Sequence, residues 1–134
     1  MFCGLKTENA VENAQNTVEE RNPDNFGKGP LSEISVQELA RWKAQNIDFQ
    51  LVDVREGYEY EAANIGGTLI SLNNLDHNLD MISKEKPVVV HCKSGARSAK
   101  AIELLKSHGF TNLFNLKGGI LAYAKEIDAN LTVI

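Results

Sequence analysis

Short runs of apolar, mostly β-branched residues alternate along the chain with longer stretches of helical spacing. The apolar runs are FQLVDV (49–54), TLISL (68–72), PVVVHC (87–92) and TNLFNL (111–116). Helical spacing is present between and after them, at 59–63, 75–83, 96–108 and 118–128. Strands that alternate with helices usually pair in parallel and are covered on both sides. The pattern therefore predicts an α/β fold, with a mainly parallel central sheet and helices on both faces.

The region before the first apolar run divides into two parts. Residues 1–31 are rich in Asn, Glu, Gln and Gly and lack sustained apolar periodicity, which is typical of a tail or an interdomain linker. Ser35 and Glu38 then have the spacing of a capping box, which predicts a helix through about Gln45. We therefore expect the folded domain to span 32–134.

Composition limits the class of protein. Of the 134 residues, 43% are hydrophobic and 24% are charged, and the mean hydropathy is −0.27, which indicates one soluble globular domain. The net charge of −4 argues against a nucleic-acid partner that is bound through phosphate neutralisation. No stretch resembles a secretory leader or a membrane span, so we expect a cytoplasmic location and no membrane partner.

The cysteine and histidine content argues against structural metal or disulfide chemistry. Cys3 and Cys92 lie far apart in the sequence and form no CxxC pair, so the sequence indicates neither a disulfide framework nor a zinc site. His77 and His108 lack partners at metal-ligand spacing. We expect no metal, and we expect Cys92 to be a free thiol in a reducing compartment.

Cys92 is the candidate reactive group. It follows a buried strand and precedes a helix that begins near Ala96, so its sulfur is expected to face the positive end of that helix. Lys93 and Arg97 add positive charge, and Gly95 permits backbone conformations that let successive N–H groups converge on an anion. The loop is thus expected to hold a small anionic species on Cys92.

Three interpretations of this loop are possible from the residues alone. Cysteine-dependent phosphatases carry one more residue between cysteine and arginine than the four that separate Cys92 from Arg97. The smaller ring favours a sulfane sulfur over a phosphate. The third alternative is a plain core cysteine, against which the glycine and arginine of the loop argue.

Three segments together resemble the rhodanese family of sulfurtransferases: VDVREGYEYEAANIGGT (52–68), VVVHCKSGARSAKAIELLKSHGF (88–110) and LKGGILAY (116–123). The resemblance implies an enzyme in which Cys92 accepts sulfur and carries it as a persulfide, without any other cofactor. It also implies that Asp53 and Arg55 support the mouth of the site. The implied active-site loop consists of Lys93, Ser94, Gly95, Ala96, Arg97 and Ser98.

The beginning of the chain and the segment 49–72 are most similar to the fusion proteins in which a rhodanese domain follows the adenylyltransferase of molybdopterin-synthase activation. In these proteins an F-C-G closes the preceding domain, as Phe2-Cys3-Gly4 would here. The resemblance implies an adenylyltransferase domain N-terminal to this chain in the full-length protein. The sulfur donor would be thiosulfate or a cysteine desulfurase. The acceptor would be the Gly-Gly tail of a ubiquitin-like sulfur carrier used for molybdopterin, thiamine or thiolated tRNA.

Two alternatives to this function stay open. One is a standalone transferase that uses thiosulfate or a small persulfide, and the other is a non-catalytic module that keeps the fold for partner binding. The intact pair of Cys92 and Arg97 argues against the second.

Several polar residues also have a structural interpretation. Asp53 and Arg55 share one side of their strand and are expected to form an ion pair or to brace a loop, as an alternative to direct catalysis. His91 is expected to lie on the opposite side of its strand from Cys92. Residues 117–119 are expected to form the turn that opens the last helix, and Trp42 to pack against the sheet.

Overall fold

The computed structural model describes residues 32–134. The predicted tail or linker at 1–31, including Cys3, lies outside the described residues. In the described part, five parallel strands form one sheet in the order β1-β5-β4-β2-β3. The elements, with 3-10 helices labelled η, are β1 (Glu33–Ile34), α1 (Val36–Ala44), β2 (Gln50–Asp53), α2 (Gly57–Ala62), β3 (Thr68–Leu69), η2 (Leu72–His77), η3 (Leu79–Met81), β4 (Val88–His91), α3 (Ala96–Ser107), β5 (Leu113–Leu116) and α4 (Gly119–Glu126).

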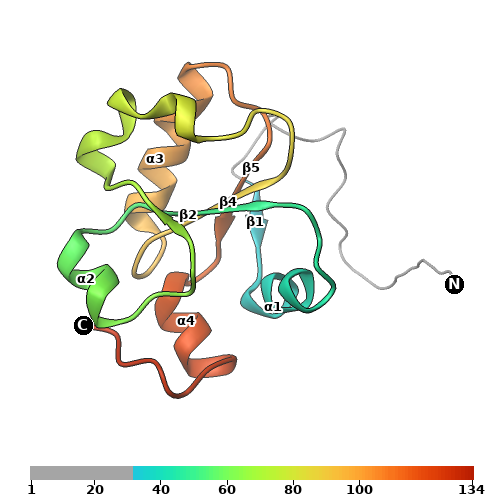
Figure 1. Ribbon diagram of the computed structural model, residues 1–134, viewed down its shortest axis with the longest axis vertical. Coiled ribbons are helices and arrows are strands. Elements are labelled where there is room, and N and C mark those ends of the chain that lie inside the picture. The colour runs from blue at the N-terminus through green and yellow to red at the C-terminus, as the bar shows by residue number, and fades with distance from the viewer. Residues whose placement is uncertain (1–31) are drawn as a thin grey trace, which may run out of the picture.

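The sheet lies between two helical layers, which confirms the predicted fold class. Figure 1 shows α3 and the 72–81 segment on one side of the strands, with α1 and α4 on the other. The strand side chains contribute to two apolar clusters, one on each face of the sheet, because successive residues of a strand point to opposite faces. The cluster under α3 includes Val52, Val88, Val90, Ile102 and Leu105; the cluster under α1 and α4 includes Leu39, Leu51, Val89, Phe114 and Ile120.

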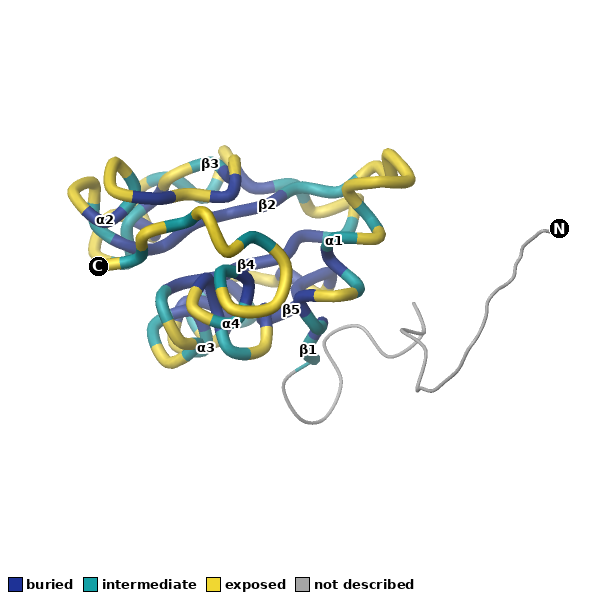
Figure 2. The backbone as a smooth tube through the Cα atoms, turned by 90° about the horizontal axis from the view of Figure 1, so that it is seen from below, coloured by how far each residue is buried: buried dark blue, intermediate teal, exposed yellow. Residues whose placement is uncertain are grey.

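Strands β4 and β5 are buried along their whole length. All four residues of β4 and all four of β5 are buried, as Figure 2 shows by colour for the inner part of the chain. Trp42 packs edge-on against Phe114 at a ring-centroid distance of 5.9 Å, which confirms that this residue covers the sheet. Continuous apolar strands of this kind require helices on both sides.

The predicted start of α1 is confirmed, and a glycine follows the end of α3. Ser35 is the N-cap of α1, and its Oγ accepts a hydrogen bond of 3.0 Å from the backbone N–H of Glu38. Gly109 follows α3 with a φ of +91°, a left-handed conformation that glycine adopts without strain at a helix C-terminus.

Two expectations about the elements were wrong in detail. The 75–83 stretch, expected to be one helix, consists of short 3-10 turns, since asparagine side chains there bond locally and compete with an α-helix. For example, Asn78 Nδ2 donates to the backbone oxygen of Asn74 at 2.8 Å. The strand expected over 68–72 is limited to Thr68–Leu69, and the two-residue edge strand β1 was not predicted.

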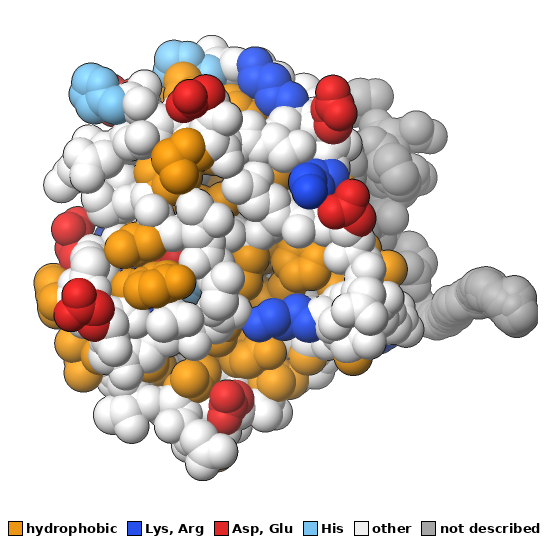
Figure 3. Space-filling view, in the orientation of Figure 1, with side chains coloured by type: hydrophobic (Ala, Val, Ile, Leu, Met, Phe, Trp, Pro, Cys, Tyr) orange, Lys and Arg blue, Asp and Glu red, His pale blue; other side chains and the backbone are white. Residues whose placement is uncertain are grey.

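Acidic and basic side chains are scattered over the face shown in Figure 3, and hydrophobic side chains are exposed between them. Within residues 32–134, none of the helices combines the length and the apolarity that crossing a bilayer requires.

Parallel pairing places the carboxyl ends of all the strands at one edge of the sheet. There, β2 leads into α2, β4 leads into α3 and β5 leads into α4. The N-termini of three helices therefore meet at the edge where α/β proteins usually bind ligands. Cys92 lies at this edge, in the connection between β4 and α3.

Candidate active site

The connection from β4 to α3 folds back on the sulfur of Cys92. Gly95 has a φ of +118° and is the N-cap of α3, a conformation that side chains resist. Its backbone N–H donates to Cys92 Sγ at 3.1 Å. The Ser98 hydroxyl lies 3.4 Å from the same sulfur. The predicted helix start at Ala96 and the predicted convergence of N–H groups on Cys92 are both present.

These donors lower the pKa of the Cys92 thiol below its ordinary value. Burial of the thiol raises its pKa, but the Ser98 hydroxyl and the backbone N–H groups of Ser98, Gly95 and Ser94 outweigh that effect. A cysteine that is only 1% exposed would otherwise be held as a neutral thiol. The loop therefore favours an anionic sulfur at a buried position.

Asn115 on β5 supports the loop from the neighbouring strand. Its Oδ1 lies 2.6 Å from the Ser98 hydroxyl, and its Nδ2 donates to the backbone oxygen of Gly95 at 3.2 Å. The hydroxyl has a single proton, so it donates to Asn115 or to Cys92 Sγ but not to both. Ionisation of Cys92 makes the sulfur a stronger acceptor, because hydrogen bonds to charged groups are the stronger ones.

The first turn of α4 supports the loop by hydrogen bonds to its backbone oxygens. Ile120 N–H donates to the backbone oxygen of Cys92 at 3.0 Å, and Leu121 N–H donates to that of Lys93 at 3.1 Å. A Cβ atom at Gly119 would lie 2.4 Å from the Lys93 oxygen, so only glycine permits this approach. The glycine turn at 117–119 thus opens the last helix, as predicted, and also supports the candidate site.

Arg97, which was expected to add positive charge beside Cys92, is bonded to an acidic side chain. Its guanidinium forms two hydrogen bonds with the carboxylate of Glu59 on α2, Nη1 to Oε1 at 2.8 Å and Nη2 to Oε2 at 2.9 Å. The hydrogen bonds from Arg97 make the largest contribution to lowering the pKa of Glu59, to about 2, so Glu59 stays ionised. The arginine of the loop is therefore already paired with an anion.

Asp53 and Arg55 form the predicted ion pair, but neither side chain reaches the mouth of the site. Both are fully buried, and Arg55 Nη2 donates to Asp53 Oδ2 at 2.8 Å. Arg55 also donates to the backbone oxygens of Glu59, at 3.3 Å, and Ala63, at 2.7 Å. The pair braces α2 against the end of β2, because α2 is too short to be held by its own hydrogen bonds.

His91 lies on the opposite side of β4 from Cys92, as predicted, and is fully buried. Burial lowers the pKa of His91, although the charge of Asp53 opposes the shift. Its Nε2 lies 3.5 Å from Asp53 Oδ2, but Arg55 already neutralises that carboxylate. The imidazole is therefore neutral and is not part of an ion pair.

The structure places three of the six predicted loop residues around the sulfur, since the backbone or side chain of Ser94, Gly95 and Ser98 faces it. Lys93 and Ala96 belong to the loop backbone, and the Lys93 side chain is half-buried. Sequence reasoning missed Glu59 and Asn115. They lie 38 residues from Arg97 and 17 from Ser98, and only the tertiary fold places them there.

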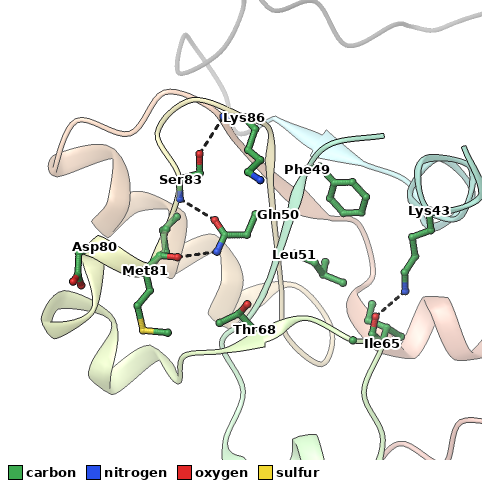
Figure 4. A pocket seen from close by; sticks show the side chains of 12 residues that line it. Lys43, Phe49, Gln50, Leu51, Ile65, Thr68, Asp80, Met81, Ser83 and Lys86 are labelled. Carbon is green, nitrogen blue, oxygen red and sulfur yellow. Dashed lines mark hydrogen bonds between the residues drawn. The ribbon is translucent and has the colours of Figure 1, made fainter. Parts of the chain in front are cut away.

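A separate pocket of about 710 Å³ lies at the other end of β2 (Figure 4). Its polar groups are largely bonded to protein: Gln50 bonds to Met81 and Ser83, and Lys43 donates to the oxygen of Ile65. It contains none of the residues that face Cys92. In the described part of the chain, Asp, Glu, His and Cys side chains form no group of three that could hold a metal ion.

Comparison with known proteins agrees with the geometry. The family model for the rhodanese-like domain matches residues 35–126 of this chain. The chain belongs to the rhodanese-like family. It is 28% identical to a rhodanese-like domain protein from Staphylococcus aureus, with a TM-score of 0.67 over 78% of this chain and 99% of that one.

Relatives of the chain include proteins named as sulfurtransferases. It is 29% identical to the probable adenylyltransferase/sulfurtransferase MoeZ of Mycobacterium tuberculosis, over 98% of this chain and 31% of that protein. It is 33% identical to a sulfurtransferase of Allochromatium vinosum, over 71% of this chain and 90% of that one. The chain thus spans about a third of the mycobacterial relative and is a rhodanese-like domain of the sulfurtransferase kind.

Gly119→Ala tests the support from α4. The added methyl group forces the Lys93 carbonyl away, and the φ of +63° adds backbone strain, so the free energy of unfolding should fall by about 1–3 kcal/mol. Alkylation of Cys92 near neutral pH should also become slower, because the loop N–H groups lose their alignment with the sulfur. Gly57→Ala is the control, since its Cβ would meet no atom within 4 Å. Equal alkylation rates in both variants and the wild type would contradict the role of Gly119.

Glu59→Gln tests the ion pair through its pH dependence. The pKa of Glu59 is lowered to about 2 from 4.5, so the pair stabilises the fold above pH 4.5 and this contribution is lost as the pH falls towards 2. At pH 7 the variant should be about 1–2 kcal/mol less stable in urea unfolding, with a smaller difference at pH 3. Glu61→Gln, at an exposed position of α2, is the control. A difference that is independent of pH would refute the assignment.

Proposed function

We propose that this chain is a sulfurtransferase domain that carries sulfane sulfur as a persulfide on Cys92. The observation that supports the proposal most directly is the set of donors around Cys92 Sγ, which lowers the pKa of a buried thiol. A thiolate is the nucleophile in exchange at a sulfur atom, and a low pKa also makes the same sulfur a good leaving group. Both properties are needed in a carrier.

In the loading step, the Cys92 thiolate attacks the sulfane sulfur of the donor. A new S–S bond forms on Sγ, and the bond between the sulfane sulfur and the donor breaks. Its electron pair leaves with the donor, as sulfite from thiosulfate or as a thiolate from a persulfide. The N–H groups of Ser94, Gly95 and Ser98 then face the persulfide, whose terminal sulfur is the new anion.

In the transfer step, a small nucleophile attacks the terminal sulfur and the electron pair of the S–S bond returns to Cys92. Covalent catalysis of this kind divides one exchange into two displacements. With an activated acyl acceptor, the terminal sulfur is the nucleophile: it attacks the acyl carbon and displaces its leaving group, which gives an acyl disulfide on Cys92. An external thiol then attacks Cys92 Sγ, forms a mixed disulfide with it and releases the thiocarboxylate. A second external thiol reduces the mixed disulfide and regenerates the Cys92 thiolate.

The acceptor that we propose is the adenylated Gly-Gly tail of a ubiquitin-like sulfur carrier, in molybdopterin, thiamine or thiolated-tRNA synthesis. The similarity to the mycobacterial adenylyltransferase/sulfurtransferase supports this, since it covers 98% of the chain and so includes most of 1–31, outside the family match at 35–126. In that relative the two activities named belong to one protein, and we propose that this chain acts beside an adenylyltransferase.

Cys92→Ser should abolish sulfur loading and leave the fold intact, because serine fills the same space but forms no persulfide. The measurement is the intact mass of the protein after incubation with cysteine persulfide or thiosulfate. The wild type should gain the mass of one sulfur atom, and Cys92→Ser should gain none. Cys3→Ser is the matched control and should load like the wild type. Loading of the Cys92→Ser protein, or no loading of the wild type by any donor, would refute the proposed function.

A further inference from the structure

Arg97 is the cation of the loop that an anionic donor would be expected to bind, but its charge is already balanced. The Arg97 side chain is 36% exposed, whereas the Glu59 side chain that it binds is 6% exposed. Two parallel N–H···O bonds of 2.8 and 2.9 Å occupy one side of the guanidinium. The pair thus presents almost no net charge to a molecule that approaches Cys92.

Glu59 is held where it is by its own helix and strand. Its Oε1 also accepts a hydrogen bond of 3.0 Å from the backbone N–H of Glu56. The buried Arg55, fixed by Asp53, binds the backbone oxygens of Glu59 and Ala63. Moving Arg97 to an incoming anion would leave a buried carboxylate without its partner, which is strongly unfavourable.

Arg97 nevertheless belongs to the loop that follows Cys92, in the first turn of α3. The hydrogen bonds to Glu59 make the largest contribution to raising the pKa of Arg97. The negative charge of Cys92 makes a smaller contribution in the same direction. A free guanidinium at this position would therefore stabilise a second anion beside Cys92. The other ion pair near the loop has no net charge, because Asp53 neutralises Arg55. Lys93 is the cation of the loop that has no acidic partner among the described residues.

We propose that Glu59 determines donor specificity: by neutralising Arg97, it disfavours dianionic donors such as thiosulfate and selects donors that release a thiolate. This inference rests on the proposed function and concerns its loading step. With a persulfide donor, the Cys92 thiolate bonds to the terminal sulfur of R–S–SH, and the electron pair of the broken S–S bond leaves as R–S⁻. With thiosulfate, the thiolate must approach a dianion and release sulfite, with Lys93 alone to offset the charge.

The test compares kcat/KM for thiosulfate and for cysteine persulfide in the wild type and in Glu59→Gln. The amide keeps the size of the side chain and an oxygen for the Glu56 N–H, but frees the charge of Arg97. We expect kcat/KM for thiosulfate to rise at least about tenfold, the effect of one charge-assisted hydrogen bond, with little change for cysteine persulfide. The double variant Glu59→Gln, Arg97→Gln should lose this gain. Glu61→Gln, exposed on the same helix, is the control.

The outcomes separate the inference from the proposed function. Unchanged or reduced kcat/KM for thiosulfate in Glu59→Gln, with cysteine persulfide still accepted, would overturn the role of Glu59 alone. Failure of both donors with the wild type would overturn the proposed function. If Glu59→Gln does not fold, the wild type still decides: a higher kcat/KM for thiosulfate than for cysteine persulfide would mean that neutralising Arg97 does not disfavour the dianion, and would overturn the inference.

Discussion

The convergence of N–H donors on one sulfur atom is the interaction on which the rest of this structure depends. The donors of Ser94, Gly95 and Ser98 face Cys92 Sγ only because β4 ends at His91, Gly95 adopts a left-handed φ and α3 begins at the next residue. An anion at a buried position is costly unless hydrogen bonds replace its hydration. The loop supplies these bonds from the Ser98 hydroxyl and from backbone N–H groups, so the stabilisation of the sulfur does not depend on a mobile cation.

The surrounding fold fixes this loop from several sides. Asn115 on β5 binds the loop at Gly95, and the first turn of α4 binds the carbonyls of Cys92 and Lys93. On the third side, the buried Asp53–Arg55 pair holds α2, and α2 carries the Glu59 that binds Arg97. Apart from Lys93, the charges around the sulfur are thus balanced in pairs, which leaves the Ser98 hydroxyl and the backbone N–H groups of the loop as the principal stabilisation of the anion.

Four of the five described strands, the start of α1 and the turn between Cys92 and α3 could be predicted from the sequence, because these depend on local patterns. A continuous apolar run followed by Cys92, Gly95 and a helical stretch defines β4, the turn and α3 within one segment. The partners of the loop could not be predicted in this way. Glu59 reads as an ordinary acidic residue of a short helix, and its contact with Arg97 exists only when β2 and β4 pair in parallel. The apolar spacing of 75–83 predicts a helix, whereas the structure has short 3-10 helices there because asparagine side chains bond locally.

The most direct test of this account is a titration of the Cys92 thiolate by its ultraviolet absorbance, with Cys92→Ser as the blank and Ser98→Ala as the comparison. The account predicts a wild-type midpoint below that of an ordinary cysteine, and a higher midpoint in Ser98→Ala because one donor to the sulfur is lost. A wild-type midpoint at or above that of a free cysteine would contradict it, since burial would then outweigh the loop donors.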